Sequence, residues 1–385
     1  MFAKRVLAVW IGVLVICLGA TVLQAQSLTP EQALGKMIFF DTNLSQPGGQ
    51  SCGTCHQPGS AFSDPDGSLP VSFGVIGDRT GMRNTPPASY AVFSPAFHFD
   101  DAEGLYIGGQ FWDGRASTLA DQAKGPFLNP LEMNNTKAGV IGAIRTSTYA
   151  NAFKAVYGAA SLDDVDSAYD KMANAIAAYE ASSELNSFTS KYDYYLKGQV
   201  ALTARETRGL ELFTNEMKGN CAACHPIETP EGSPGPLFTD FSYDNIGIPR
   251  NLNIPAYEDD PTLQDLGLGV TVGDAAENGK FKVSSLRNVA VTGPWGHNGF
   301  FTDLEDVVQF YNRRDVTPGL WGLPEVPENV NTSELGNLGL TDEEVMDIVY
   351  FLHTLNDGYT VPEPCTLGLL ALGAMGVFCR RRCRQ

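Results

Sequence analysis

Residues 52–56 read Cys-Gly-Thr-Cys-His, and residues 221–225 read Cys-Ala-Ala-Cys-His. The C-x-x-C-H spacing is typical of covalent c-type haem attachment, in which both thiols bond to the haem and the His becomes an axial ligand of the iron. A redox disulfide, a zinc knuckle and chance are the alternatives, and two motifs that both end in His favour haem. We therefore expect two bound haems c, attached through Cys52, Cys55, Cys221 and Cys224, with His56 and His225 as iron ligands.

The N-terminus reads as a secretory signal. Lys4 and Arg5 precede an apolar run that extends from Val6 to about Ala20, and small residues near Ala25 mark a cleavage site. A transmembrane anchor is the alternative, but the run is short for spanning a bilayer. We expect residues 1–25 to be a cleaved signal peptide.

The C-terminus carries a second targeting pattern. Pro362-Glu363-Pro364 precedes an apolar stretch from Cys365 to Phe378, and four arginines follow. This order resembles the bacterial PEP-CTERM sorting tail, which implies that residues 361–385 are held in the membrane transiently or permanently and that the protein lies in the periplasm or at the cell surface. A plain membrane anchor flanked by basic residues is the alternative, with the same topology.

Cysteine use and charge agree with export. Four of the eight cysteines lie in the two motifs, and the others lie in the targeting segments, which leaves none for a structural disulfide. The net charge is −18, and loss of both basic termini would make the chain more acidic. Such acidity disfavours nucleic acid and anionic lipid surfaces and would steer a basic partner, although solubility alone also explains it.

The chain is long enough for two domains, one for each motif. Residues 26–195 would form the first domain and residues 196–360 the second. Thr29-Pro30-Glu31 is a good helix start, and that helix should run to about Phe40. Apolar residues at helical spacing predict further helices over residues 116–124, 136–155, 161–184, 203–216, 303–312 and 341–355. We therefore expect a mainly α fold with long loops over 57–87 and 226–283.

Several motifs between the two haem sites carry a family resemblance. They are Phe111-Trp112-Asp113-Gly114-Arg115, Asn129-Pro130-Leu131-Glu132-Met133, Ser285-Leu286-Arg287-Asn288-Val289, Thr292–Gly299 and Phe310-Tyr311-Asn312. In this order the chain resembles the bacterial di-haem cytochrome c peroxidases and their MauG-group relatives over about residues 30–357. The resemblance implies two cytochrome-c-like helical domains, in which the N-terminal haem reacts with peroxide and the C-terminal haem passes electrons to it.

The resemblance also assigns roles to single residues. Trp112 matches the Trp between the haems, Gln122 and Glu132 match the peroxide-pocket pair, and the interdomain calcium ligands match Asn84, Thr292 and Pro294. A carboxylate above a haem can take a proton from one peroxide oxygen and return it to the other, which fits Glu132. Each of these residues also has an ordinary structural explanation. Glu132 could be a surface acid, Gln122 an amide on a helix surface and Trp112 a core residue.

Two departures from the family pattern affect the iron ligands. The loop around Ser72–Val75 has no His, so we expect an open or water-occupied first iron that needs no reductive activation; Met82 is the alternative ligand. Tyr311 stands fourteen residues after His297, where standard peroxidases of the family carry Met. A Tyr311 phenolate on the second iron would stabilise its ferric state, and a buried helical Tyr is the alternative.

The leading hypothesis is an enzyme that reduces hydrogen peroxide with electrons from a small cytochrome or copper protein, and a basic partner of this kind would fit the acidic charge of the chain. MauG-like, peroxide-dependent oxidation of a protein or organic substrate is the second hypothesis. A di-haem electron carrier without turnover is the third. The sequence is compatible with a homodimer.

Overall fold

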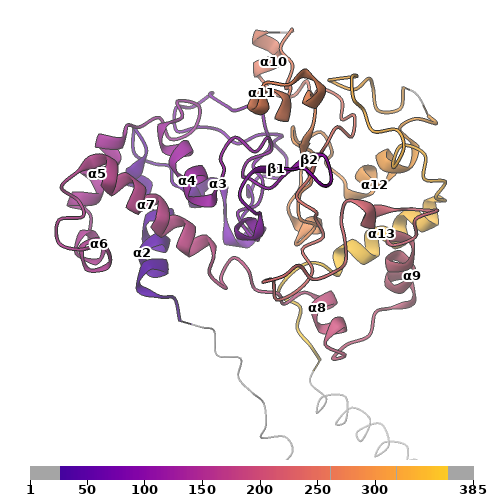
Figure 1. Cartoon of the computed structure of the whole chain (residues 1–385), viewed down its shortest axis with the longest axis horizontal. Coiled ribbons are helices and arrows are strands. Elements are labelled where there is room, and N and C mark those ends of the chain that lie inside the picture. Colours follow the sequence, from indigo (N-terminus) through magenta and orange to yellow (C-terminus); the bar gives the residue numbers. More distant parts are fainter. Residues whose placement is uncertain (1–26, 261, 318, 363–385) are drawn as a thin grey trace, which may run out of the picture. The chain divides into compact units, whose positions relative to one another are not determined.

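Two crossed helix pairs form the framework of the chain (Figure 1). Helix α2 (Pro30–Phe39) packs on α7 (Val165–Glu180), and α9 (Ala204–Phe213) packs on α13 (Asp342–His353). In each pair, the first helix leads the chain into a C-x-x-C-H motif. The computed structural model describes residues 27–260, 262–317 and 319–362, so the predicted signal peptide and most of the predicted sorting tail lie outside the described residues.

A glycine lies at the crossing point of each pair. A Cβ atom on Gly35 would lie 1.8 Å from the carbonyl oxygen of Ala175, and one on Gly209 would lie 2.0 Å from the carbonyl oxygen of Asp347. No side chain fits at such distances, so each glycine lets two helix backbones touch. A glycine therefore permits close helix packing in both halves of the chain.

The first helix pair is surrounded by α4 (Leu119–Leu128), α5 (Lys137–Thr146) and α6 (Ala150–Tyr157). Their apolar faces form one buried core, which includes Leu34, Phe39, Phe127, Ile141, Phe153 and Ile176. The start predicted at Thr29 is confirmed, because its hydroxyl accepts a hydrogen bond from the Gln32 amide. Helix α7 is shorter at both ends than expected.

Two predicted helices differ from the observed ones. The helix expected over 136–155 is two helices, because the Thr146 and Ser147 hydroxyls bond to backbone carbonyls of α5 and compete with helix continuation. The helix expected over 116–124 begins at Leu119, since Thr118 caps the Asp121 amide, and it continues through Pro126 to Leu128.

The second helix pair is joined by α12 (Leu304–Arg313), and α8 (Lys191–Leu196) precedes it. A second core includes Phe213, Phe238, Leu304, Val345, Ile348 and Phe351. The helices expected from residues 303 and 341 begin there, since the Asp303 and Thr341 side chains accept hydrogen bonds from the Glu305 and Glu344 amides. Residues 28–358 belong to one compact unit, and the domain boundary at 195/196 stays a prediction.

Little of the described chain is β structure. Strand β1 (His98–Asp100) pairs antiparallel with β2 (Leu105–Ile107), and β3 (Tyr243–Asp244) pairs antiparallel with β4 (Phe281–Lys282). Short helices α3 (Cys52–Cys55), α10 (Ala256–Asp259) and α11 (Leu268–Val272) interrupt long loops. The mainly α fold with long loops is confirmed. No helix in the described ranges is long and apolar enough to cross a membrane.

Substituting the crossing glycines should destabilise the protein. Gly35→Ala and Gly209→Ala each place a methyl group inside contact distance of a backbone oxygen, and we expect a loss of about 1–3 kcal/mol despite the better helix propensity of Ala. Denaturant unfolding of the haem-loaded protein measures this. Gly142→Ala on α5 is the control, because nothing lies within 4 Å of its added Cβ and it should be neutral or stabilising. Equal stability of all three variants would contradict the packing role.

Candidate active site

Both motif histidines are held by a backbone carbonyl. The Nδ1 atom of His56 lies 2.9 Å from the carbonyl oxygen of Phe62, and that of His225 lies 2.8 Å from the carbonyl oxygen of Phe238. An Nδ1–H that donates there leaves the Nε2 lone pair for a metal. Burial lowers the pKa of both imidazoles, which favours the neutral, ligating form. Both rings are therefore held in the way that an iron ligand would require.

The two acceptor residues share an unusual backbone conformation. Phe62 and Phe238 are buried and have φ angles of 60° and 54°, in the left-handed region that bulky side chains rarely adopt. Such a residue costs about 1–3 kcal/mol, so the surrounding contacts must hold it in place. Sequence reasoning could not find these acceptors, because every residue has a carbonyl.

The first motif opens onto a cavity of about 480 Å³ whose lining includes Cys52, Cys55 and His56. This is the volume range of cofactor sites in proteins. All four motif cysteines are free thiols, and burial raises the pKa of Cys55 to about 11 and those of Cys221 and Cys224 to about 12. Two cysteines beside an imidazole whose Nε2 is available to a metal fit covalent haem attachment at each motif.

The cavity wall also contains Trp112, Gln122 and Glu132, so the structure brings together the three residues that the sequence proposed as catalytic. Gln122 comes from α4, and Glu132 lies in the turn that follows this helix. The Glu132 amide bonds to the Asn129 carbonyl, and its own carbonyl accepts a hydrogen bond from the Val75 amide. These bonds fix the backbone of Glu132 at the cavity.

The surroundings of the Glu132 carboxyl have opposite effects on its pKa. Burial raises its pKa, while a 2.7 Å hydrogen bond from Asn129 Nδ2 and the positive charge of Arg115 act against that rise. Arg115 itself lies over the Phe111 ring, with 3.6 Å between the guanidinium carbon and the ring centroid, and it pairs with Asp113. A carboxyl with such balanced surroundings is suited to taking up and releasing a proton.

Trp112 connects the two halves of the chain. Its indole Nε1 donates to the Asn84 carbonyl at 2.8 Å, and its own carbonyl accepts the Lys282 amide at 2.8 Å. A further link comes from Arg83, whose guanidinium contacts Asp265 at 2.6 Å and Asp113 at 2.7 Å. Arg83 and Asp265 line the cavity, so residues from the second half complete its wall. Sequence spacing gave no signal for this pairing.

The loop that lacks a His reaches the same cavity. Ser72 and Phe73 line it, and the Phe73 carbonyl accepts a hydrogen bond from Gln50 Nε2 at 2.8 Å. Met82 also lines the cavity and packs against the buried pair Ile254 and Tyr257. Both expectations, an open first iron and ligation by Met82, stay predictions.

Glu180 is a cavity residue that the sequence analysis missed. It is 5% exposed, it lines the cavity from the last turn of α7, and its Oε2 atom has no hydrogen-bond partner among the described residues. Burial raises the pKa of its carboxyl to about 8. A signal was available, because Glu180 follows the buried Met172 and Ile176 at helical spacing, on the face that meets the core.

Tyr311 lies on α12 close to the second motif. Its pKa is raised by burial and by the nearby Cys224, Asp244 and Cys221 side chains. The phenol is half-buried and packs beside Phe310, at 6.3 Å between ring centroids. Tyr311 is thus near enough to Cys221 and Cys224, which would carry the second haem, to interact with their charges.

The remaining predicted ligands are partly brought together. The Asn84 amide bonds to the His297 carbonyl at 2.8 Å, which sets Asn84 beside the segment that follows Pro294. Asn84 Nδ2 donates to the Pro70 carbonyl, so its side-chain oxygen is available to a hard cation. His297 is buried and stacks on Phe281 at 3.6 Å. His98 and His353 are exposed on β1 and α13.

Comparison with known proteins gives consistent findings. A model of the family described as "Di-haem cytochrome c peroxidase" matches residues 29–201, and a model of the PEP-CTERM protein-sorting motif matches residues 360–382. The methylamine utilization protein MauG of Paracoccus denitrificans is 42% identical over 84% of this chain and 88% of its own length. The cytochrome c551 peroxidase of Pseudomonas aeruginosa is 33% identical over 87% of this chain and 82% of its own.

Solved structures show the same similarity. The diheme peroxidase BthA of Burkholderia thailandensis superimposes with a TM-score of 0.78 at 36% identity, covering 88% of each chain. A MauG-like protein associated with microbial copper homeostasis superimposes with a TM-score of 0.67 at 27% identity, covering 90% of this chain and 97% of its own.

Glu180 should make stability depend on pH. Its pKa of about 8 in the folded protein exceeds the ordinary 4.5, so between these values the unfolded chain loses the proton that the folded chain keeps. This group then lowers the free energy of unfolding by about 1.4 kcal/mol for each pH unit. Glu180→Gln removes the effect, so the variant should match the wild type near pH 4.5 and be more stable by a few kcal/mol at pH 8.

Denaturant unfolding of the haem-loaded protein at the two pH values measures this difference. Glu211→Gln is the control, because it makes the same chemical change at an exposed position of α9. A stability difference between Glu180→Gln and the wild type that does not change with pH would contradict the assignment.

Proposed function

Because the chain belongs to the family of di-haem cytochrome c peroxidases, and is therefore an oxidoreductase with two haems c, we propose that it reduces hydrogen peroxide at the haem attached through Cys52 and Cys55. Proteins of this family take electrons from small redox proteins. The observation that carries the proposal is the 480 Å³ cavity, where Trp112, Gln122 and Glu132 line the same space as the first motif.

Glu132 is the proposed proton carrier. Reduction to two waters needs two electrons and two protons, and cleavage of the O–O bond needs one proton moved from the near oxygen to the departing one. When bound, the haem supplies the iron that holds the peroxide and delivers the electrons. Glu132 takes the first proton on its carboxylate and returns it, while Asn129 holds the carboxyl through Oε1 and Gln122 orients the substrate or a water.

Trp112 is the proposed connection for electrons. They would enter at the second haem, held by His225 and Tyr311, and pass Trp112 to the haem held by His56. In support, Trp112 lines the first cavity and is bonded through its carbonyl to Lys282 of the second half. The acidic net charge of −18 fits a basic donor protein.

A second candidate function is MauG-like oxidation of a protein or organic substrate. Tyr311 beside Cys224, together with 42% identity to a protein named MauG, favours it over a plain peroxidase. The chemistry at Glu132 would be the same, and the electrons would come from the substrate. An electron carrier without turnover is disfavoured because Glu132 and Gln122 line the same cavity as the first motif, and a carrier needs neither a proton-accepting carboxylate nor an orienting amide there.

Calcium, export and assembly complete the proposal. Asn84 would bind calcium with Thr292 and Pro294, and no group of three or more His, Cys, Asp or Glu side chains within the described ranges offers another metal site. The sorting motif indicates an exported protein, which we place in the periplasm or at the cell surface with residues 361–385 anchored or removed.

The two haem domains would span 26–195 and 196–360, and a homodimer is compatible with this arrangement.

Removing the Glu132 carboxylate should stop peroxide reduction. Glu132→Gln keeps the size of the side chain and its bond to Asn129 but cannot carry the proton, so we expect kcat/KM for peroxide to fall by about 10²–10⁴-fold. Gln122→Leu should give a smaller loss. Steady-state peroxide consumption with a reduced small cytochrome measures both. An unchanged absorption spectrum of the oxidised haems is the control, and full activity of Glu132→Gln would refute the proton-carrier role.

The oxidised protein should react with peroxide directly. Since residues 72–75 contain no His, the first iron is expected to be open without prior reduction. One equivalent of peroxide added to the fully oxidised, haem-loaded protein should change the absorption spectrum rapidly in stopped flow. Reaction only after one haem has been reduced would show a capped iron. Met82→Leu then identifies the cap, because the resting spectrum of the first haem would change in this variant.

A substrate test separates the two enzyme functions. With peroxide and a candidate partner, a covalent or oxidative change in the partner that is absent with Glu132→Gln supports the MauG-like reaction. Peroxide consumption that depends only on an added electron donor supports the peroxidase.

A further inference from the structure

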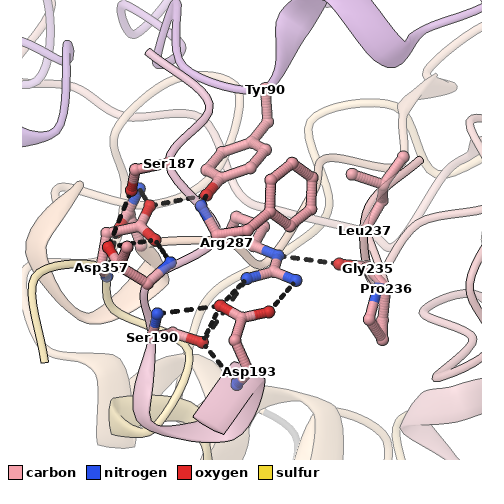
Figure 2. Close-up of polar contacts among 12 residues, drawn as sticks. Tyr90, Ser187, Ser190, Asp193, Gly235, Pro236, Leu237, Arg287 and Asp357 are labelled. Carbon is pink, nitrogen blue, oxygen red and sulfur yellow. Dashed lines mark hydrogen bonds and ion pairs between the residues drawn. The ribbon is translucent and has the colours of Figure 1, made fainter. Parts of the chain in front are cut away.

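Arg287 is a fully enclosed cation next to the segment that orients His225. It is 1% exposed, and its Nη1 and Nη2 atoms contact the Asp193 carboxylate at 2.7 and 2.8 Å. Its Nε donates to the Pro236 carbonyl at 2.8 Å. Figure 2 shows the guanidinium held between Asp193 and Pro236. A buried ion pair with this geometry is rigid, and it fixes whatever backbone it bonds.

Three aromatic rings surround the guanidinium. The rings of Phe188, Tyr90 and Phe238 lie 4.6, 5.3 and 5.7 Å from its central carbon. All three residues have left-handed φ angles, of 49°, 64° and 54°. Each such conformation is costly for an aromatic residue, and three around one cation show that the cluster maintains strained backbone. Phe238 is the residue whose carbonyl accepts the hydrogen bond of His225.

The acceptor segment is held at successive residues. Besides Arg287 on Pro236, the Ser285 hydroxyl donates to the Leu237 carbonyl at 2.6 Å. The Thr239 hydroxyl donates to the Val283 carbonyl at 2.6 Å. Side-chain and backbone groups of residues 283–287 therefore clamp residues 236–239 on both sides of Phe238. The direction of the Phe238 carbonyl is fixed by this clamp.

At the first haem site, no arginine or lysine among the described residues bonds to the backbone next to Phe62, and the Phe62 carbonyl has two hydrogen-bond donors. The Phe62 carbonyl receives His56 Nδ1 at 2.9 Å and also the Ala88 amide at 2.9 Å, while the Ser89 hydroxyl bonds to the Ala61 carbonyl at 2.8 Å. Within the described residues, the Phe238 carbonyl has His225 as its hydrogen-bond donor and no other. A carbonyl shared by two donors is the weaker acceptor for each. The bond to His225 is therefore expected to be the stronger one.

We propose that Arg287 is a positioning residue for His225: it holds residues 236–238 so that the Phe238 carbonyl serves the His225 ring alone, which lowers the reduction potential of the second haem relative to the first. This rests on the proposed role of His225 as the axial ligand of that haem. A stronger hydrogen bond from Nδ1–H gives the imidazole more anionic character, and a more electron-rich ligand stabilises ferric iron.

The proposal is tested by the potentials of both haems in the same molecule. Arg287→Lys keeps the positive charge beside Asp193 but loses the planar group that bonds Asp193 and Pro236 together. Ser285→Ala removes only the bond to Leu237 and serves if Arg287→Lys does not fold. Ser89→Ala is the matched control, because it removes the equivalent bond one residue before Phe62. Spectroelectrochemical titration of the haem-loaded variants gives the two potentials.

We expect Arg287→Lys and Ser285→Ala to raise the potential of one haem, the same in both variants, and to leave the other unchanged. A tenfold change in the one-electron redox equilibrium, about 59 mV, is expected for Arg287→Lys and a smaller shift for Ser285→Ala. Ser89→Ala should change the reduction potential of the other haem only. Equal shifts of both haems, or wild-type potentials in folded Arg287→Lys and Ser285→Ala, would overturn the proposal.

The result that would refute the proposed peroxidase function differs from the result that would refute the role of Arg287. The potentials do not depend on peroxide turnover, so a selective shift in a protein that does not consume peroxide refutes the enzyme function and leaves the role of Arg287 intact. A wild-type spectrum without a histidine-ligated second haem would remove the premise that both share.

Discussion

The hydrogen bond from each motif histidine to a phenylalanine carbonyl is the constraint on which the site depends. An imidazole can present Nε2 to iron in a fixed direction only if Nδ1 is held, and a backbone carbonyl holds it at 2.9 Å in one half and 2.8 Å in the other. Both carbonyls belong to residues in left-handed conformations, Phe62 and Phe238. The rest of each half supplies the contacts that keep these conformations in place, through Ala88 and Ser89 in one and Ser285 and Arg287 in the other.

The two halves repeat one plan and then diverge where function requires it. Each has a helix pair that crosses at a glycine, a C-x-x-C-H motif after the first helix, and a held histidine. The cavity at the first motif has the carboxyl groups of Glu132 and Glu180 in its wall, and such groups are suited to proton transfer. Near the second motif lies Tyr311, a side chain able to occupy a ligand position. This difference supports a division between a reacting haem and an electron-supplying haem.

The sequence predicted what local chemistry determines. Thr29, Asp303 and Thr341 start helices where expected, because a capping side chain acts within its own turn. The break after Thr146 was missed, since hydroxyl groups that compete with a helix look like ordinary polar residues in a periodic pattern. The family pattern singled out Trp112, Gln122 and Glu132, and the structure brings all three to one cavity. The pairing of Arg83 with Asp265 joins residues far apart in the chain, and no local pattern reports it.

The two carboxyl groups in the cavity wall, those of Glu132 and Glu180, differ in their interaction partners. Glu132 has a hydrogen bond from Asn129 and the nearby charge of Arg115, which favour its ionised form against burial. Glu180 has neither, and burial alone raises its pKa to about 8. Near neutral pH, Glu180 is therefore an uncharged part of the wall, and Glu132 is the group with surroundings that permit a change of charge. When the surroundings of two titratable groups in one pocket give them different pKa values, the group with compensating partners is suited to exchange protons with the substrate. The proposal that Glu132 transfers the proton is therefore supported by this difference in partners as well as by its place in the family pattern.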